Sequence, residues 1–203
     1  MKNITIALLS LLAVSCAGMH GHDHEVEWVD YGDNPMMNPD YMAAMAAAGA
    51  PGEEHAELAK GVGTFDVDMK WWAGPGGDPM PMTAVANVEM IFGGRYMVEH
   101  FHGSMMGESF EGRLLMGYDN LAEEYFSLWI DDMSTSRGMM TGNKDEDGVL
   151  HMSGWMRDPM TPGGRMWRME AEVGGGDTFV NRFYDTLPDG GEYKSMEMIY
   201  KRR

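Results

Sequence analysis

The pattern of hydrophobic and polar positions changes at Gly61. Beyond this residue, short runs are either alternately apolar and polar or wholly apolar, and glycine, proline and aspartate separate them. Such runs are typical of β-strands joined by turns. The pattern predicts strands near residues 63–72, 83–92, 95–102, 109–116, 123–131, 135–142, 149–157, 165–173, 178–184 and 193–202.

The connections between these runs are short, as in FGGR, KDEDGV, VGGGDT and LPDGGE. Glycine and aspartate suit hairpin turns, and no connection is long enough to hold a crossover helix, so the sheet should be antiparallel. A meander of about ten strands leaves two open edges unless the sheet closes on itself. We therefore expect an all-β fold, a single antiparallel up-and-down β-barrel.

The segment before Gly61 has a different character and contains two short helix candidates. In NPDYMAAMAAAG, Asn38 is a possible cap, Pro39 takes the first helical position and Gly49 ends the alanine-rich run. In GEEHAELAKG, the acidic residues come first and a lysine comes last, as the helix dipole favours. These helices would form a short N-terminal extension to the barrel.

The first residues, MKNITIALLSLLAVSCAG, have the pattern of an export signal. The apolar stretch of about eleven residues is too short to span a bilayer. LAVSC resembles a bacterial lipobox, in which the cysteine becomes the lipidated N-terminus, and Cys16 is the only cysteine. We predict a lipoprotein signal peptide over residues 1–15, a tether with a short helix over 16–50 and the β-barrel domain over 51–203. The alternative is ordinary cleavage after Ala17.

On the lipoprotein reading, the protein is exported to the bacterial cell envelope, held to the membrane by its lipid anchor alone, and faces the periplasm. The chain carries 15 basic and 32 acidic residues, a formal net charge of −17. This charge repels phosphate backbones, so nucleic acid is not expected as a partner. Hydrophobic residues make up 44% of the chain, which indicates a folded domain and not a disordered acidic tail.

The stretch YFSLWIDDMSTSRG has two different faces if it is a strand. One face carries Tyr125, Ser127, Trp129 and Asp131, a mixture that suits a barrel lumen, with Trp129 stacking on a ligand and Asp131 accepting a hydrogen bond. The other face, with Phe126, Leu128 and Ile130, needs a cover, either the alanine-rich helix or the partner in a homodimer. The alternative is that Trp129 is a core residue and Asp131 caps the following turn.

In RYMVEHFHG, Glu99 lies on the same face as two apolar residues, and a buried carboxylate needs a partner. Arg113, Arg168 or Arg182 would supply it, and Glu99 and Trp71 would then line the lumen. His100 and His102 share the opposite face and form at most half of a metal site. No motif combines a nucleophile with a base, so we lean against an enzyme, although an enzyme stays an alternative.

Methionine is unusually frequent, with 24 residues in the chain. Thioethers are soft ligands that select Cu(I), and HGHDH adds His20, His22 and His24, which would bind a metal weakly. Periplasmic binding of copper or another metal is therefore the main alternative function. We favour methionine as an adaptable core filler, because most of these residues alternate within predicted strands.

Five blocks of the sequence resemble a known family: GEEHAELAKGVGTFDVDMKWW, GGRYMVEHFHG, SFEGRLLMGYDN, YFSLWIDDMSTSRG and FYDTLPDGGEYKSMEMIYKR. From Gly52 to Arg202, the chain is similar to the bacterial domain-of-unknown-function family numbered 1579. The resemblance implies a calycin-like barrel, similar in architecture to lipocalins and nitrobindins. Such barrels usually hold a small apolar or amphipathic ligand in the lumen.

Two relatives of that architecture suggest finer functions. Nitrobindin-like proteins bind haem through a histidine on a late strand, but the last histidine is His151, so haem is not expected and no cofactor is predicted. Fatty-acid-binding proteins often hold a carboxylate with an arginine and a tyrosine two residues apart, and NRFYD offers Arg182 and Tyr184. The alternative for this pair is a surface arginine beside a core tyrosine.

Overall fold

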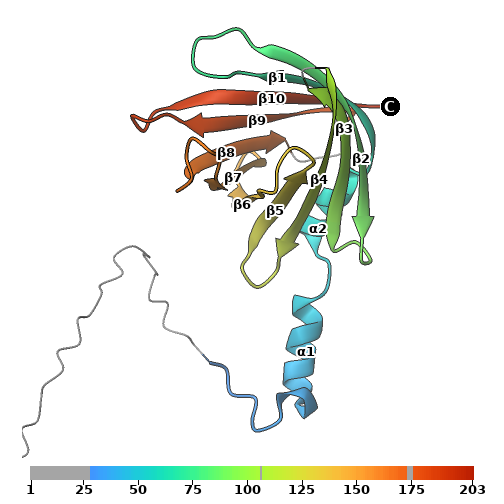
Figure 1. The fold of residues 1–203 in the computed structure, drawn as a ribbon. Coiled ribbons are helices and arrows are strands. Elements are labelled where there is room, and N and C mark those ends of the chain that lie inside the picture. Colours follow the sequence, from blue (N-terminus) through green and yellow to red (C-terminus); the bar gives the residue numbers. More distant parts are fainter. Residues whose placement is uncertain (1–27, 106, 173–175) are drawn as a thin grey trace, which may run out of the picture.

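The computed structural model describes residues 28–105, 107–172 and 176–203 (Figure 1). Ten antiparallel strands form a closed barrel in which each strand pairs with its neighbours in sequence, and β1 pairs with β10. The prediction of an up-and-down barrel is therefore confirmed. Cys16 and His20, His22 and His24 lie outside the described residues, so their predicted roles stay predictions.

The helices and strands follow one another without a crossover. The helical elements are η1 (Pro35–Met37), α1 (Pro39–Ala48) and α2 (Glu53–Lys60). The strands are β1 (Gly63–Trp71), β2 (Met80–Ile91), β3 (Tyr96–Met105), β4 (Glu108–Asp119), β5 (Glu124–Asp131), β6 (Gly138–Lys144), β7 (Val149–Met156), β8 (Arg165–Glu172), β9 (Thr178–Thr186) and β10 (Glu192–Arg202).

The period of two along each strand separates an apolar interior from a polar exterior. In β1, Phe65, Val67 and Met69 are buried, whereas Asp66 and Asp68 between them are exposed. Burial of such side chains stabilises the closed sheet, because each buried large apolar group contributes roughly 1.5–3 kcal/mol. The inward positions of neighbouring strands meet in register, as Phe65 does opposite Ala86, so the sequence pattern places the barrel interior directly.

The two helices predicted in the N-terminal extension are both present. Asn38 caps α1, because its side-chain oxygen accepts hydrogen bonds from the backbone N–H groups of Asp40 and Tyr41. No helix in the described part of the chain combines the length and the apolar character needed to cross a bilayer.

Helix α2 covers one end of the barrel, which we call the floor. Figure 1 shows this helix beside the ends of β3 and β4. Leu58 of α2 is buried in the same cluster as Met116 and Leu150, and Glu57 forms an ion pair with Lys144 at the end of β6. The opposite end, which we call the mouth, is bordered by the loops 72–79, 132–137, 157–164 and 187–191.

The outer faces of β5, β6 and β7 keep an apolar strip. Ile130, Met139 and Trp155 are about half-exposed there, with exposed fractions of 49, 52 and 57%. Helix α1 does not cover this strip, because its C-terminal end is held at the floor, where Asn120 donates hydrogen bonds to the carbonyl oxygens of Ala48 and Ala50. Coverage by a second copy of the chain stays a prediction.

Candidate ligand-binding cavity

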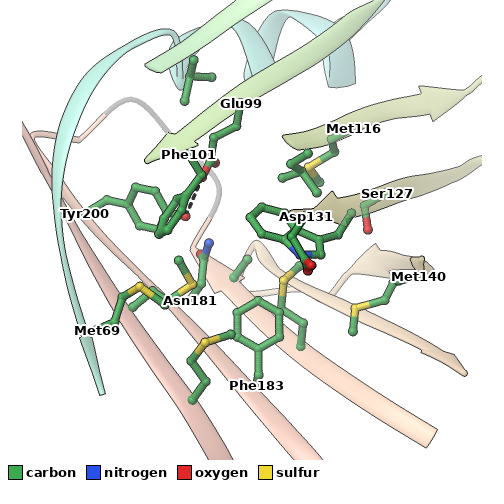
Figure 2. Close-up of a pocket in the computed structure, with 18 of the residues that line it drawn as sticks. Met69, Glu99, Phe101, Met116, Ser127, Asp131, Met140, Asn181, Phe183 and Tyr200 are labelled. Carbon is green, nitrogen blue, oxygen red and sulfur yellow. Dashed lines mark hydrogen bonds between the residues drawn. The ribbon is translucent and has the colours of Figure 1, made fainter. Parts of the chain in front are cut away.

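A cavity of about 730 Å³ occupies the barrel interior. Its walls come from all ten strands, and Glu57, Leu58 and Gly61 close it at the floor. Figure 2 shows side chains from opposite walls, such as Glu99 and Phe183, pointing into the same space. Clefts of this size hold small organic ligands in many proteins.

Methionine dominates the cavity lining, with twelve of the described methionines facing the interior. Six of them surround the mouth: Met80, Met82, Met105, Met133, Met156 and Met196. We call these the mouth methionines. Methionine side chains are flexible and polarisable, so such a surface adapts to apolar groups of different shape. Half of the methionines of the sequence therefore line the cavity. Strand periodicity predicted that they belong to the core but not that they surround a cavity.

The floor carries a buried polar pair, Glu99 and Tyr200. Glu99 is only 5% exposed, and its carboxyl oxygen accepts a hydrogen bond of 3.1 Å from the Tyr200 hydroxyl (Figure 2). Burial raises the pKa of Glu99 to about 7, because the charged form loses its hydration. Burial and the neighbouring carboxyl group raise the pKa of Tyr200 well above its ordinary value.

The predicted arginine partner of Glu99 was wrong. Arg113, Arg168 and Arg182 each make an ion pair with a glutamate other than Glu99. They occupy outward positions of their strands, opposite in parity to the cavity-lining residues Leu114, Trp167 and Asn181. The sequence did not predict Tyr200 as the partner of Glu99, because the two residues are far apart in the chain. The inward position of Tyr200 in the last strand was the one available indication.

Two further polar groups face the cavity without a partner. The Asn181 side-chain oxygen and the Trp167 indole nitrogen are buried, and neither has a hydrogen-bond partner among the described residues. A buried polar group without a partner costs about 1–3 kcal/mol, so a bound molecule that pairs with one of these groups would recover free energy. Neither residue was singled out from the sequence, because a lone inward asparagine or tryptophan is common in strands.

Trp129 and Asp131 are joined to each other at the mouth side of β5. The indole nitrogen of Trp129 donates a hydrogen bond of 2.9 Å to one oxygen of Asp131, and the ring packs against Phe101 and Phe110. The other oxygen of Asp131 accepts hydrogen bonds from the backbone N–H groups of Met133 and Ser134. Asp131 therefore both lines the cavity and caps the turn.

The indole of Trp129 fits because the neighbouring strand has no side chain at Gly112. A Cβ atom on Gly112 would overlap the six-membered part of the indole. Glycine at this position therefore allows the ring to lie flat against β4 and to form one wall of the cavity.

Comparison with known proteins agrees with this architecture. The sequence model of a family described as "Protein of unknown function (DUF1579)" matches residues 50–202. The chain belongs to this family. The resemblance found in the five sequence blocks is thereby confirmed, and the DUF1579 region coincides with α2 and the ten strands. Among curated proteins, none matches the chain.

The other predicted ligand-binding residues of the DUF1579 barrel are divided between its two faces. Trp71 lines the cavity beside the mouth. Tyr125 points inward but lies outside the cavity lining, packed against Tyr118 with 5.0 Å between ring centroids. Burial raises the pKa of Tyr125 to about 12, and its hydroxyl has no hydrogen-bond partner in the described part of the chain.

Arg182 and Tyr184 do not line the cavity. The Tyr184 hydroxyl donates a 3.0 Å hydrogen bond to Glu170, and the Arg182 guanidinium lies 3.6 Å from Glu172. Both belong to the outward set of β9, because the inward set is Phe179, Asn181 and Phe183. Their shared parity was predicted correctly, but the face was wrong, so this pair cannot hold a carboxylate in the lumen.

The histidines of the DUF1579 barrel strands lie on its outside, each beside a carboxylate. His100 is 3.6 Å from Glu89, His102 is 3.4 Å from Glu111 and His151 is 2.7 Å from Asp145. Within residues 28–105, 107–172 and 176–203, no three side chains from His, Cys, Asp or Glu gather as a metal site. His100 and His102 therefore gain no third ligand of these types there.

Proposed function

We propose that this DUF1579 protein is an exported lipoprotein whose barrel binds a small apolar or amphipathic molecule in its lumen. The observation that carries the proposal is the 730 Å³ cavity, which is lined mainly by methionine and aromatic residues and has a few polar groups at fixed places. An apolar lining gives affinity through the hydrophobic effect, and the polar groups orient the ligand.

The alkyl or aromatic part of the ligand would lie among Phe101, Trp129 and Phe183, and its polar part would meet Glu99 or Asn181. Access through the mouth methionines fits a ligand that varies in shape, because unbranched thioether chains change rotamer easily. Lipidation at Cys16 would hold the barrel at the periplasmic surface of a membrane, where amphipathic molecules are concentrated.

Binding can be tested with an environment-sensitive apolar fluorophore and a variant that fills the lumen. Ala171 is buried and lines the cavity, so Ala171→Phe should reduce the number of bound probe molecules per protein. Thr141→Phe, on the exposed outer face of β6, is the matched control and should bind as the wild type does. Equal binding by all three proteins at similar melting temperatures would place the probe outside the lumen and contradict the proposal.

A second candidate function is binding of a soft metal ion such as Cu(I). It is favoured by the number of methionine side chains that face one cavity, since thioether sulfur prefers soft metals. Titration with Ag(I) tests it without redox chemistry. Replacing Met80 and Met82 by leucine should then weaken Ag(I) uptake, whereas Met139→Leu on the outer face should not. Equal uptake by both variants excludes Met80 and Met82 as ligands.

A further inference from the structure

We propose that the ligand carries a primary or secondary ammonium group on an apolar body, and that this group binds at the floor between Glu99 and Asn181. The inference rests on the proposed function, because it assumes that the lumen is a ligand site. It adds the chemical class of the ligand and its orientation, with the ammonium group at the floor and the apolar body toward the mouth.

The charges around the cavity exclude an anionic head group. Four acidic residues border it: Glu57, Glu99, Asp131 and Glu172, the last at the end of β8 with outward parity. None of its described lining residues is lysine, arginine or histidine. A fatty acid would therefore bury its carboxylate without a counter-charge, which is costly. The net charge of −17 adds a field that attracts cations.

Three of the four carboxyl groups already have their partners. Glu57 pairs with Lys144, Glu172 lies 3.6 Å from Arg182, and Asp131 accepts hydrogen bonds from Trp129 and the turn. Glu99 differs, because it is the most deeply buried of the four and accepts a hydrogen bond only from a neutral hydroxyl. A ligand cation would supply the counter-charge that the described residues do not provide at this position.

A second acceptor faces the same part of the cavity. The buried Asn181 oxygen has no partner in the described chain, and Asn181 pairs with Met198, two residues before Tyr200 on the same face of β10. Figure 2 shows the Tyr200 hydroxyl meeting Glu99 and the Asn181 side chain extending into the same part of the cavity. An ammonium group with two or three N–H donors satisfies both acceptors at once, whereas a quaternary ammonium has no N–H donor.

Binding of such a cation is coupled to a proton. With its pKa raised to about 7, Glu99 is largely protonated in the empty cavity at mildly acidic pH. A bound ammonium favours the carboxylate, so the carboxyl proton leaves to solvent as the N–H···O bond forms. The other titratable groups that border the lumen are Glu57, Asp131, Glu172 and Tyr200, and the first three keep the partners described above.

The proposal is tested by calorimetry with three ligands that share one alkyl chain and end in a primary amine, an alcohol or a carboxylate. Wild-type protein should bind the amine most tightly and the carboxylate least tightly. Glu99→Gln should weaken amine binding by roughly tenfold or more and leave the alcohol almost unchanged. The matched control is Glu172→Gln, which removes a carboxylate that borders the cavity and is already paired with the outward Arg182. This variant should bind the amine and the alcohol as the wild type does.

The outcomes separate the two proposals. If the alcohol binds in the lumen but the amine binds no more tightly, or if Glu99→Gln and Glu172→Gln behave alike, the ammonium inference is wrong and the lumen stays a ligand site. If the protein binds none of the three ligands, the proposed function is wrong as well. Should Glu99→Gln not fold, Asn181→Leu provides a second test, because it removes an acceptor without touching the carboxyl group and should also weaken the amine selectively.

Proton release provides a measurement that needs no variant. Amine binding by the wild type at pH 6, measured in buffers of different ionisation enthalpy, should release close to one proton per bound amine, because Glu99 is mostly protonated before binding and charged afterwards. Alcohol binding should release none. Equal proton release for both ligands would contradict an ammonium contact with Glu99.

Discussion

At the scale of single residues, the Glu99 carboxyl group is unfavourable for the stability of the empty barrel and favourable for binding a cation. It lies among apolar side chains, where its charge is costly and its neutral form is tolerated. An apolar residue would stabilise the empty barrel better, so a carboxyl group here suits a molecule that enters and compensates it.

Glu99 also makes the stability of the empty barrel depend on pH. Its pKa is about 7 in the folded state and close to its ordinary value of 4.5 in the unfolded chain, so the neutral form favours folding. This stabilisation is complete below pH 4.5 and is lost as the pH rises through 7. We expect the wild type to lose up to roughly 3 kcal/mol across this range relative to Glu99→Gln.

Thermal melting of the two proteins at a series of pH values measures this difference directly. The control is Glu172→Gln, whose difference from the wild type should not follow the same course between pH 4.5 and 7. If the Glu99→Gln and wild-type curves stay parallel, Glu99 ionises in the folded barrel as easily as in water, and its surroundings do not raise its pKa.

Asp131 is a residue whose two oxygens have separate tasks, and two substitutions distinguish them. Asp131→Ala removes the hydrogen bonds to the turn and to Trp129, so it should lower stability by about 1–3 kcal/mol and also change probe binding. Asp131→Asn keeps one oxygen, which can accept the hydrogen bonds of the turn, but it has no second oxygen to accept the hydrogen bond from Trp129. It should therefore change the fluorescence of the lumen probe with a smaller loss of melting temperature; identical behaviour of the two variants would show that the indole contact has no separate effect.

At the scale of elements, the ten strands were predictable because their inward and outward positions alternate so regularly. Several boundaries differ by three residues, among them that of β6, which was predicted to begin at 135 and begins at Gly138. Residues 132–137 contain hydroxyl side chains that suit either a strand or a turn. Asp131 stabilises the turn, because its carboxylate accepts hydrogen bonds from the backbone N–H groups of Met133 and Ser134. Such a local competition depends on the geometry of the preceding strand end, which strand periodicity does not encode.

The position of α2 could not be predicted, although the helix itself was. A helix with a narrow apolar face pairs equally well with many surfaces, and only the closed barrel shows that Leu58 fills its floor. The same limit explains the error at Arg182 and Tyr184. Parity shows that two residues share a face of a strand, but the neighbouring strands decide which face is the interior.

The role of α2 as the floor predicts that Leu58 contributes to the stability of the whole barrel. Leu58→Ala should reduce the free energy of unfolding by about 2–5 kcal/mol, because the residue is buried in a cluster with Met116 and Leu150. Met45→Ala in α1 removes a side chain that is 53% exposed and is the control, with a change near zero. Denaturant unfolding of both variants measures the difference, and a small effect at Leu58 would mean that α2 is only part of the tether.

At the scale of the whole molecule, the barrel and its N-terminal segment have different tasks. The barrel presents a cavity with carboxyl groups and a helix at the floor and a methionine-rich mouth. The segment before it, with the predicted signal peptide and tether, would export the barrel and hold it at the cell envelope. The sequence predicted the barrel, its methionine-rich interior and the inward positions of Trp71, Glu99, Trp129 and Asp131. It did not predict the pairing of Glu99 with Tyr200, because that contact joins β3 to β10 across the lumen.

The lipid anchor belongs to this scale as well, and a single substitution tests it. Cys16→Ser should move the protein from the membrane fraction to the soluble exported fraction, because no thiol then remains for lipidation. Fractionation of cells that express the wild type and the variant gives the answer. Retention of Cys16→Ser in the membrane fraction would contradict the anchor, and a wild type found already in the soluble exported fraction would favour cleavage after Ala17 instead.

The central claim, that the lumen is the binding site, is tested most directly by anomalous diffraction from crystals of the protein grown with a terminally brominated long-chain alcohol. Bromine gives a position that depends on no assumption about the ligand pose. The account predicts an anomalous peak inside the barrel, in the space bounded by Phe101, Phe183 and Met196. A peak found only on the outer strip at Ile130, Met139 and Trp155, with the interior free of bromine, would contradict it.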